Sequence, residues 1–399
     1  MDNLLKKLLA LFSRAKSGES VVGIDIGSSS IKAVQIRRKS GRAILETYGE
    51  VATGPYAGVE VGRAARLSQE KTIEALKDLI REASITTTLC GVAIPLASSM
   101  VTHIEMPAFD EKQLPEMIPI EARKYIPVPI SEVTLDWSVI PKSESRTEVE
   151  PELESAPALE SVAGADSDTE SSPTFPSAAL GAPLQKLDVL IAAIHNEVLS
   201  NYQSVISGAG LSSSFFEIEV FSTIRATLVD PTKKLLLFDM GATATKLYIV
   251  EDGIVRAVHI VNHGSQELSL AIAEAFAVPI SEGERLKRST GLSSSAGAPD
   301  ISKVVESTLF YIFSEAARFV QAYQNKNGVA ISGVVLSGGG VNLQGFVDRA
   351  REALMLPIEI ADPFALLQAP AFLDPVLKNA GPEFAVAIGV ALRHLQEAA

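Results

Sequence analysis

Two loops of nearly the same composition contain the residues whose types and spacing suggest chemistry. One runs from Asp25 to Lys32 and reads Asp-Ile-Gly-Ser-Ser-Ser-Ile-Lys; the other runs from Asp239 to Lys246 and reads Asp-Met-Gly-Ala-Thr-Ala-Thr-Lys. Each loop lies between two apolar segments that read as strands. Glycine and small residues let backbone amides approach an anion closely, and hydroxyl groups add donors. The pattern predicts two hairpins that hold a polyphosphate from both sides.

The aspartate that opens each loop adds a metal site to this prediction. Asp25 and Asp239 both stand at a strand end, where two carboxylates can hold a hydrated Mg2+ beside the phosphates. Either loop alone is also compatible with an ordinary hairpin turn. Two matching copies, 214 positions apart, favour an internal duplication with a shared ligand.

A glycine turn late in the chain is a third candidate element. Residues 334–343 read Val-Val-Leu-Ser-Gly-Gly-Gly-Val-Asn-Leu, which predicts a buried strand, a glycine turn and a helix start. Such a turn offers a flat backbone surface for a nucleobase or ribose. Because glycine turns between strand and helix are common, this signal has weight only together with the two loops.

The composition indicates a globular protein of a reducing compartment. The chain has 399 residues, of which 47% are hydrophobic, enough to form more than one domain core. The single cysteine, Cys90, excludes an internal disulfide framework and leaves a Cys/His zinc site unsupported. No stretch approaches the roughly 20 apolar residues of a spanning helix, and the first residues lack a secretory signal pattern. We therefore expect a cytoplasmic protein.

The negative charge is concentrated in one segment. The net charge is -13, and residues 141–183, with nine acids and two basic residues, contribute -7 of it. This segment is rich in Ser, Ala, Pro and Glu, which predicts a disordered acidic insertion. No basic patch with interleaved aromatic residues occurs, so we expect no nucleic-acid partner.

The first 20 residues read as a separate basic amphipathic segment. In residues 1–16, leucines and Phe12 alternate at helical spacing with lysines and an arginine. Such a segment could make a peripheral contact with a membrane surface or lie against a partner. A frayed tail, or a helix packed on its own domain, is the alternative.

The remaining sequence alternates between predicted strands and helices in two halves, residues 21–233 and 234–399. The first half contains a small subdomain at about residues 85–190. This alternation predicts two α/β domains with a ligand cleft between them. The predicted helices cover residues 69–82, 111–125, 197–209, part of 215–229, 266–276, 281–287, 301–325 and 383–395, the last packing back on the first domain.

The two loops and the glycine turn resemble those of the actin, Hsp70 and sugar kinase superfamily. A more specific resemblance, to the PilM family of cytoplasmic actin-like proteins of type IV pilus assembly, rests on four segments. They are Val-Ala-Ile-Pro at 92–95, Glu-Met-Pro at 105–107, Glu-Ala-Arg-Lys-Tyr-Ile-Pro-Val-Pro-Ile at 121–130, and Glu-Val-Thr-Leu-Asp-Trp at 132–137. The resemblance covers nearly everything except residues 1–20 and 141–183. It implies an actin-like α/β fold in which two duplicated domains, each with a small subdomain, flank a nucleotide cleft.

The resemblance also implies roles for individual residues around ATP and Mg2+. Asp25 and Asp239 would hold Mg2+ through water. Glu219 falls where superfamily ATPases position the attacking water, and the alternative is a helix residue at a polar surface. The phosphates would be cradled by Gly27, Ser28, Ser29, Ser30, Lys32, Gly241, Ala242, Thr243 and Thr245. The nucleoside would be contacted by Glu284, Lys287, Gly338, Gly339 and Asn342.

The function implied is an ATP-binding cytoplasmic scaffold, peripheral at the inner membrane. It would bind the cytoplasmic N-terminal tail of PilN and relay to other pilus assembly proteins, including the motor ATPase, with slow or no ATP turnover. Residues 114–130, an apolar helix followed by a proline-rich stretch, would belong to the groove that receives the tail. The alternative is that Tyr125, Ile126 and Val128 pack inward as core.

Two other functions stay open. A small-metabolite kinase of the same superfamily would need a carboxylate base aimed at its substrate, and we find none beyond Glu219. A division protein resembling FtsA would tether to membrane through a C-terminal amphipathic helix. The chain also departs from the family pattern at His263-Gly264, where paired glycines are common, and we expect His263 to be a loop residue rather than a catalyst. The acidic insertion, which replaces a short connection, should affect only the edge of the small subdomain.

Overall fold

The computed structural model describes residues 19–110, 112–140, 186–292 and 300–397. The amphipathic segment predicted for residues 1–20 therefore lies almost entirely outside the described residues. The acidic insertion predicted for residues 141–183 lies entirely outside them. Both stay predictions.

The first sheet has five strands in the order β3-β2-β1-β4-β8. Its first three strands are antiparallel neighbours, and the last two run parallel to β1. Apolar residues face both sides of β1, so both sides must be covered: Val22 and Ile24 pack under α2 and α4, and Val21 packs under α10. The elements are β1 (Ser20–Ile26), β2 (Ser30–Lys39), β3 (Arg42–Ala52), β4 (Leu89–Ile94), β8 (Ser212–Ile218), α2 (Gln69–Glu82), α4 (Asn196–Gly208), α5 (Glu219–Thr227) and α10 (Asp374–Glu397).

The second sheet repeats this arrangement in the order β11-β10-β9-β12-β13, again with three antiparallel strands followed by two parallel ones. In both sheets the candidate phosphate loop joins the first two strands in sequence, β1 to β2 and β9 to β10. The duplication predicted from the two loops is therefore a duplication of the whole sheet. The elements are β9 (Leu235–Met240), β10 (Thr245–Glu251), β11 (Ile254–Val261), β12 (Gly333–Ser337), β13 (Ile358–Ile360), α6 (Ser265–Phe276), α7 (Ile280–Thr290), α8 (Ser302–Asn327) and α9 (Phe346–Leu354).

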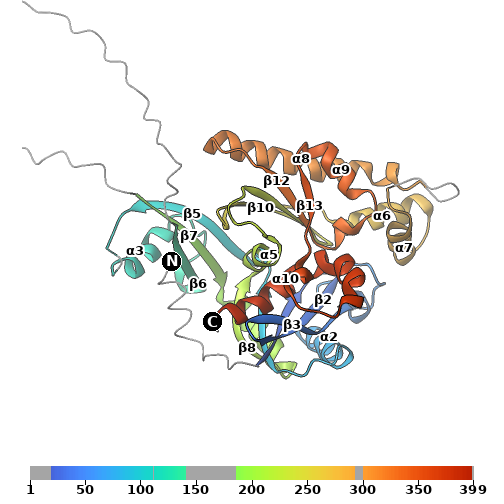
Figure 1. Cartoon of the computed structure of the whole chain (residues 1–399), viewed down its shortest axis with the longest axis horizontal. Helices are drawn as coiled ribbons and strands as arrows, with labels where there is room; N and C mark the ends of the chain where they lie inside the picture. The colour runs from blue at the N-terminus through green and yellow to red at the C-terminus, as the bar shows by residue number, and fades with distance from the viewer. Residues whose placement is uncertain (1–18, 111, 141–185, 293–299, 398–399) are drawn as a thin grey trace, which may run out of the picture.

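A small third sheet interrupts the first half. Its order is β5-β7-β6, and all its neighbours are antiparallel. Helix α3 covers one face, with Leu114, Ile118 and Ala122 packed against residues of β5 and β7. Figure 1 shows this unit to one side of the two larger sheets. The elements are β5 (Ser99–Pro107), α3 (Leu114–Ala122), β6 (Val133–Ile140) and β7 (Lys186–His195).

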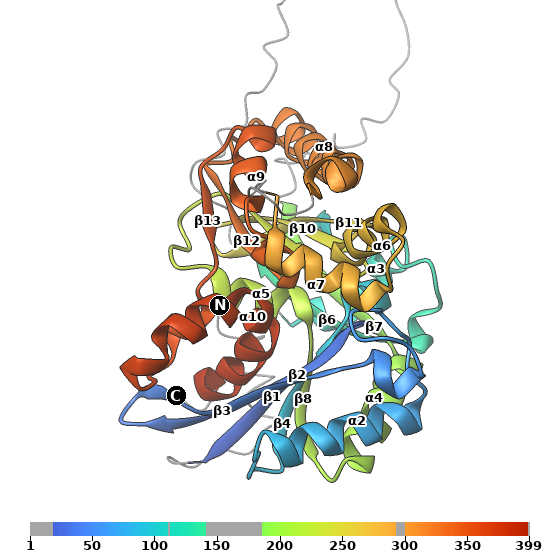
Figure 2. The same ribbon diagram turned by 90° about the vertical axis from the view of Figure 1, so that its right-hand side faces the viewer.

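Helix α10 connects the two halves. From Phe384 to Leu395 it buries its apolar side chains against the first sheet. Near its middle, the carbonyl oxygen of Pro382 accepts a hydrogen bond from the amide of Gly338 in the second half, at 2.8 Å. Figure 2 shows α10 beside the first sheet, where the second half meets it.

Two predicted helices differ from the structure for identifiable reasons, and the helix expected within residues 215–229 is present. Helix α3 covers only Leu114–Ala122 of the expected 111–125, and prolines stand in its first turn and inside it. In residues 215–229 the helix starts only at Glu219, because Phe215 to Ile218 pair with β4 instead. Helix α10 starts at Asp374 rather than at 383 and continues through Pro382. The helix start predicted after the glycine turn is a short 3-10 turn at Gly339–Asn342, and α9 begins only at Phe346. Strand β13 has no counterpart among the predicted strands.

Candidate functional site

The two loops are built alike. In the first, the Gly27 amide donates to the carbonyl of Ser30 at 3.0 Å; in the second, the Gly241 amide donates to the carbonyl of Ala244 at 3.0 Å. A side chain at Gly27 would lie 2.9 Å from the Ser30 oxygen, so the tight turn requires glycine there. Both loops are also fixed from outside, because Thr53 and Ala65 donate to Ser28 and the first residues of α6 donate to Gly241 and Ala242.

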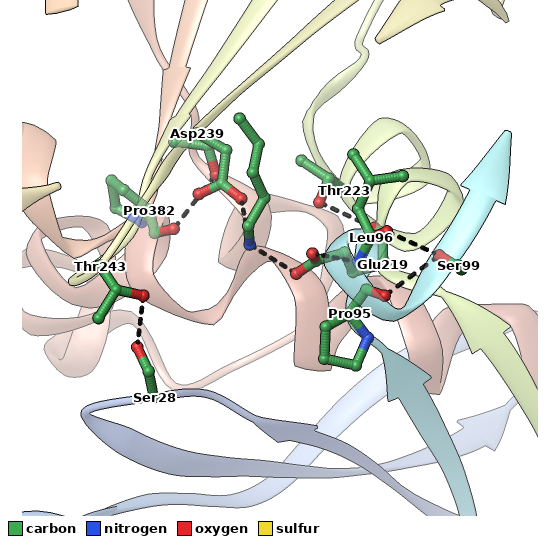
Figure 3. Close-up of polar contacts among 11 residues, drawn as sticks. Ser28, Pro95, Leu96, Ser99, Glu219, Thr223, Asp239, Thr243 and Pro382 are labelled. Atoms are coloured by element: carbon green, nitrogen blue, oxygen red, sulfur yellow. Dashed lines mark hydrogen bonds and ion pairs between the residues drawn. The ribbon is translucent and has the colours of Figure 1, made fainter. Parts of the chain in front are cut away.

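The tips of the two loops meet. The hydroxyl groups of Ser28 and Thr243 are 3.1 Å apart, and Figure 3 shows the two side chains facing each other. The structure thus brings together two loops whose aspartates are 214 positions apart in sequence. Further bonds support the junction: Ala64 donates to Gln266, and Ser281 donates to Glu60 at 2.8 Å.

Next to the loops, a lysine bridges two buried carboxylates. The Lys246 ammonium lies 2.6 Å from Glu219 Oε2 and 3.3 Å from Asp239 Oδ2, and Figure 3 shows Glu219 and Asp239 linked by these contacts. Glu219 Oε1 accepts the amide of Leu96 at 2.8 Å. Burial disfavours the ammonium ion, yet Asp239 and Glu219 hold the pKa of Lys246 well above its ordinary value. Glu219 is buried, which contradicts its alternative interpretation as a surface helix residue.

Asp25 lies in the same group of charges. Burial raises its pKa to about 6, the charges of Glu219 and Asp239 act in the same direction, and Lys32 and Lys246 oppose them. Lys32 itself pairs with Glu50 at 3.1 Å and donates to Ser30 at 2.6 Å. The raised pKa means that the two lysines do not fully stabilise the ionised carboxylate, so an added cation would be favourable here.

These carboxylates fit a hydrated Mg2+ rather than a metal ion held by protein alone. Among the described residues, no three Asp, Glu, His or Cys side chains come together closely enough to hold a metal ion. Carboxylates are hard oxygen ligands, and Mg2+ usually keeps several waters and takes phosphate oxygens. Asp25 and Asp239 could therefore hold it through water, with the oxygens of a bound phosphate as further ligands.

The glycine turn reaches this group of charges. Gly338 has φ of 85°, and a side chain there would lie 2.5 Å from Asp239 Oδ1, so only glycine fits. Beyond Gly339, Asn342 donates to the carbonyl of Asn379 at 3.2 Å and to Glu383 Oε1 at 3.0 Å, both on α10. The turn is thereby held against the helix that joins the halves.

Glu284 and Lys287 on α7 pair with each other at 2.7 Å. Partial burial favours the neutral form of Glu284, but Lys287, Ser269 and Arg288 lower its pKa to about 2. The negative charge of Glu383 favours the charged forms of Lys287 and Arg288. Because Glu383 also accepts a hydrogen bond from Asn342, these two residues are linked to the glycine turn.

The structure gives one predicted phosphate residue, Thr245, another contact. The Thr245 hydroxyl is buried and donates to the His263 carbonyl at 2.8 Å, so it faces away from a phosphate between the loops. The His263 ring packs edge-on against Tyr311, as expected of a loop residue. Lys246 was not predicted as a site residue, although its place in the second loop matches that of Lys32 in the first. Glu383 was not predicted either, and no sequence signal marks it.

Within the described parts of the chain, none of the helices is both long and apolar enough to cross a membrane.

Comparisons with solved structures identify the fold. A structure titled "PilM-PilN type IV pilus biogenesis complex" matches with a TM-score of 0.73 and 22% identity, covering 96% of this chain and 99% of that one. The ethanolamine utilization protein EutJ from Carboxydothermus hydrogenoformans matches with a TM-score of 0.51 and 14% identity, over 98% and 99% of the two chains. These likenesses confirm the predicted actin-like α/β fold.

Comparisons of sequence identify the family. The cell division protein FtsA of Pseudomonas aeruginosa is 22% identical over 96% of this chain and 91% of its own length. The family described as type IV pilus assembly protein PilM matches residues 23–168 and 178–395, nearly the whole chain. The chain therefore belongs to the PilM family of type IV pilus assembly proteins.

Proposed function

We propose that the protein binds ATP with Mg2+ between its two loops and acts as a cytoplasmic scaffold of the pilus assembly platform. The observation that carries this proposal is the pair of like-built loops whose tips meet at Ser28 and Thr243, with Asp25 and Asp239 at their bases. Loop amides and hydroxyls suit phosphates, and the two carboxylates suit a hydrated cation. Family membership supports the setting in pilus assembly.

In this proposal the residues divide into three groups. Asp25 and Asp239 hold Mg2+ through water, and Mg2+ supplies positive charge beside the phosphates. The amides of Ser28 and Ser29 and of Ala242 and Thr243, with Lys32, hold the phosphates, and Gly27 and Gly241 shape the turns that present them. The nucleoside lies between α7 and the glycine turn, near Glu284, Lys287, Gly338, Gly339 and Asn342.

We infer that ATP is held rather than rapidly hydrolysed. A carboxylate that positions or activates a water needs an oxygen available to that water. Both oxygens of Glu219 are already engaged, one by the Leu96 amide and the other by Lys246. Nucleotide would then act mainly by fixing the two halves relative to each other. This favours the scaffold over a metabolite kinase.

We further propose that the partner is the cytoplasmic N-terminal tail of PilN, which would keep the protein peripheral at the inner membrane, with relay to the motor ATPase. Support comes from the structural likeness to a PilM-PilN complex and from the surface of the small subdomain. Ile120 and Tyr125 are 52% and 43% exposed, whereas Ile126 is buried, so part of segment 114–130 offers an apolar surface. Strand β6 lies at an edge of its sheet, where an extended peptide can add.

A peptide of the PilN N-terminus tests this surface by fluorescence anisotropy. Ile120→Glu and Tyr125→Ala should weaken binding about tenfold or more, since exposed apolar anchors dominate such contacts, and should leave ATP affinity unchanged. Phe310→Glu is the matched control, because Phe310 is an apolar side chain 73% exposed on α8 in the other half. Crosslinking of the peptide to β11 would contradict the proposed surface. ATP should tighten peptide binding if nucleotide fixes the halves.

The FtsA relative makes a division protein the second candidate. In that function a C-terminal amphipathic helix would tether the protein to membrane. Helix α10 itself does not offer such a tether, because Phe384, Ile388 and Leu395 are buried against the first sheet and are not available for insertion.

A further inference from the structure

The Lys246 ammonium lies between Asp239, a carboxylate of the proposed metal site, and Glu219. It contacts Glu219 at 2.6 Å and Asp239 at 3.3 Å, and both carboxylates are about 5% exposed. Two buried carboxylates cannot remain ionised side by side without a compensating cation. In the described structure Lys246 is that cation.

The equivalent lysine of the first loop makes different contacts. Lys32 occupies the same place in its hairpin, paired in register with Asp25 as Lys246 is with Asp239. Its ammonium instead pairs with Glu50 on β3 at 3.1 Å. The duplicated loops are therefore asymmetric: the second aspartate shares a lysine with Glu219, whereas the lysine of the first loop points to a neighbouring strand.

We propose that Lys246 is a tethered cation that keeps free divalent metal out of the resting site, so that the metal is accepted only together with the nucleotide. A divalent ion alone would have to displace an ammonium from two buried carboxylates without offering it another partner. A nucleotide supplies phosphate oxygens that can replace Asp239, the more distant of the two carboxylates, as a partner of the Lys246 ammonium, while the shorter contact with Glu219 is kept. This inference rests on the proposed nucleotide site.

Mn2+ is a suitable probe because it shares the carboxylate preference of Mg2+ and its free form gives an electron paramagnetic resonance signal. In the absence of nucleotide, the parent protein should bind no Mn2+ at the loops at submillimolar concentrations. Lys246→Met should bind one Mn2+ at least about tenfold more tightly than the parent, because a unit charge is removed beside the acids. Lys246→Arg should behave like the parent. Tight Mn2+ binding by the nucleotide-free parent, equal to that of Lys246→Met, would overturn the proposal.

A control variant and a double variant complete the test. Lys77→Met, on the exposed face of α2, is the control for loss of a lysine far from the loops and should not change Mn2+ binding. If Lys246→Met does not fold, the double variant Glu219→Gln/Lys246→Met removes one charge of each sign and should still bind Mn2+ more tightly than the parent. Calorimetric titration of the parent with ATP and excess Mg2+ separates the two claims: absence of heat overturns the proposed nucleotide site, whereas the Mn2+ comparison alone decides the role of Lys246.

Discussion

Replacing Asp25 by Asn should stabilise the nucleotide-free protein at neutral and alkaline pH. Burial raises the pKa of Asp25 from 3.8 to about 6, so the folded state favours the protonated carboxyl. The cost of ionising Asp25 is absent below its unfolded pKa, grows as pH rises from about 4 to 6, and is complete above that range. A shift of roughly two units corresponds to about 3 kcal/mol. Because Asp25 is partly exposed, solvent screening reduces this figure, and we expect a gain of about 2 kcal/mol.

Urea unfolding of parent and variant at pH 8, 6.5 and 5 measures this gain. At pH 8 Asp25→Asn should be the more stable protein, and at pH 5 its advantage should be about half as large, since the parent carboxyl is then mostly protonated. Asp252→Asn is the matched control, because Asp252 is exposed in a turn with φ of 53°, a conformation that Asn also adopts.

A variant no more stable than the parent at pH 8 would refute the reasoning, as would an advantage that does not shrink at pH 5. The same experiment with saturating ATP and Mg2+ should reverse the order, since the parent gains binding free energy that Asp25→Asn lacks. Asp25→Asn would then raise the stability of the nucleotide-free protein while lowering its affinity for ATP with Mg2+.

Three further predictions follow from single contacts. Gly338→Ala should destabilise the protein by about 2 kcal/mol or more, because the new methyl group would meet Asp239 and Met240. The control Gly210→Ala replaces a glycine of nearly the same φ that faces open space, and it should cost about 1 kcal/mol. Equal losses of stability in thermal unfolding of the two variants would contradict this prediction. A double-mutant cycle on Ser28→Ala and Thr243→Ala should give a coupling free energy of under about 1 kcal/mol without nucleotide, and a larger value once ATP joins the loops. Deleting residues 141–183 with a short Gly/Ser linker should keep one cooperative melting transition and ATP binding, because β6 and β7 pair directly from Ile140 and Asp188 onward; loss of that transition would show that the segment is part of the fold.

The sequence was most informative where a pattern is repeated. The two Asp-x-Gly loops predicted both the duplication and the pairing of distant residues, because identical turn chemistry in two halves has few explanations other than a shared fold. Helix limits were less predictable: Phe215 to Ile218 have helical neighbours but form a parallel strand beside β4, a choice made by tertiary packing.

Side-chain partners were the least predictable part of the site. Glu219 was expected to position a water. In the structure one of its oxygens accepts a hydrogen bond from the Leu96 amide and the other from the Lys246 ammonium. Thr245 was expected to face phosphate, and its hydroxyl donates to the carbonyl of His263, in the loop after β11. Such contacts depend on distances between elements far apart in sequence, and no local pattern contains them.

Calorimetric titration of ATP with Mg2+ into the parent, Asp25→Ala and Asp239→Ala tests the central claim, a nucleotide site between the two loops, most directly. The parent should bind one ATP per chain. Each variant should lose at least about tenfold in affinity, because each removes one carboxylate beside the metal. Thermal unfolding of the same samples verifies that the variants are folded. Equal affinity of all three folded proteins for ATP with Mg2+ would contradict the account and place the nucleotide elsewhere.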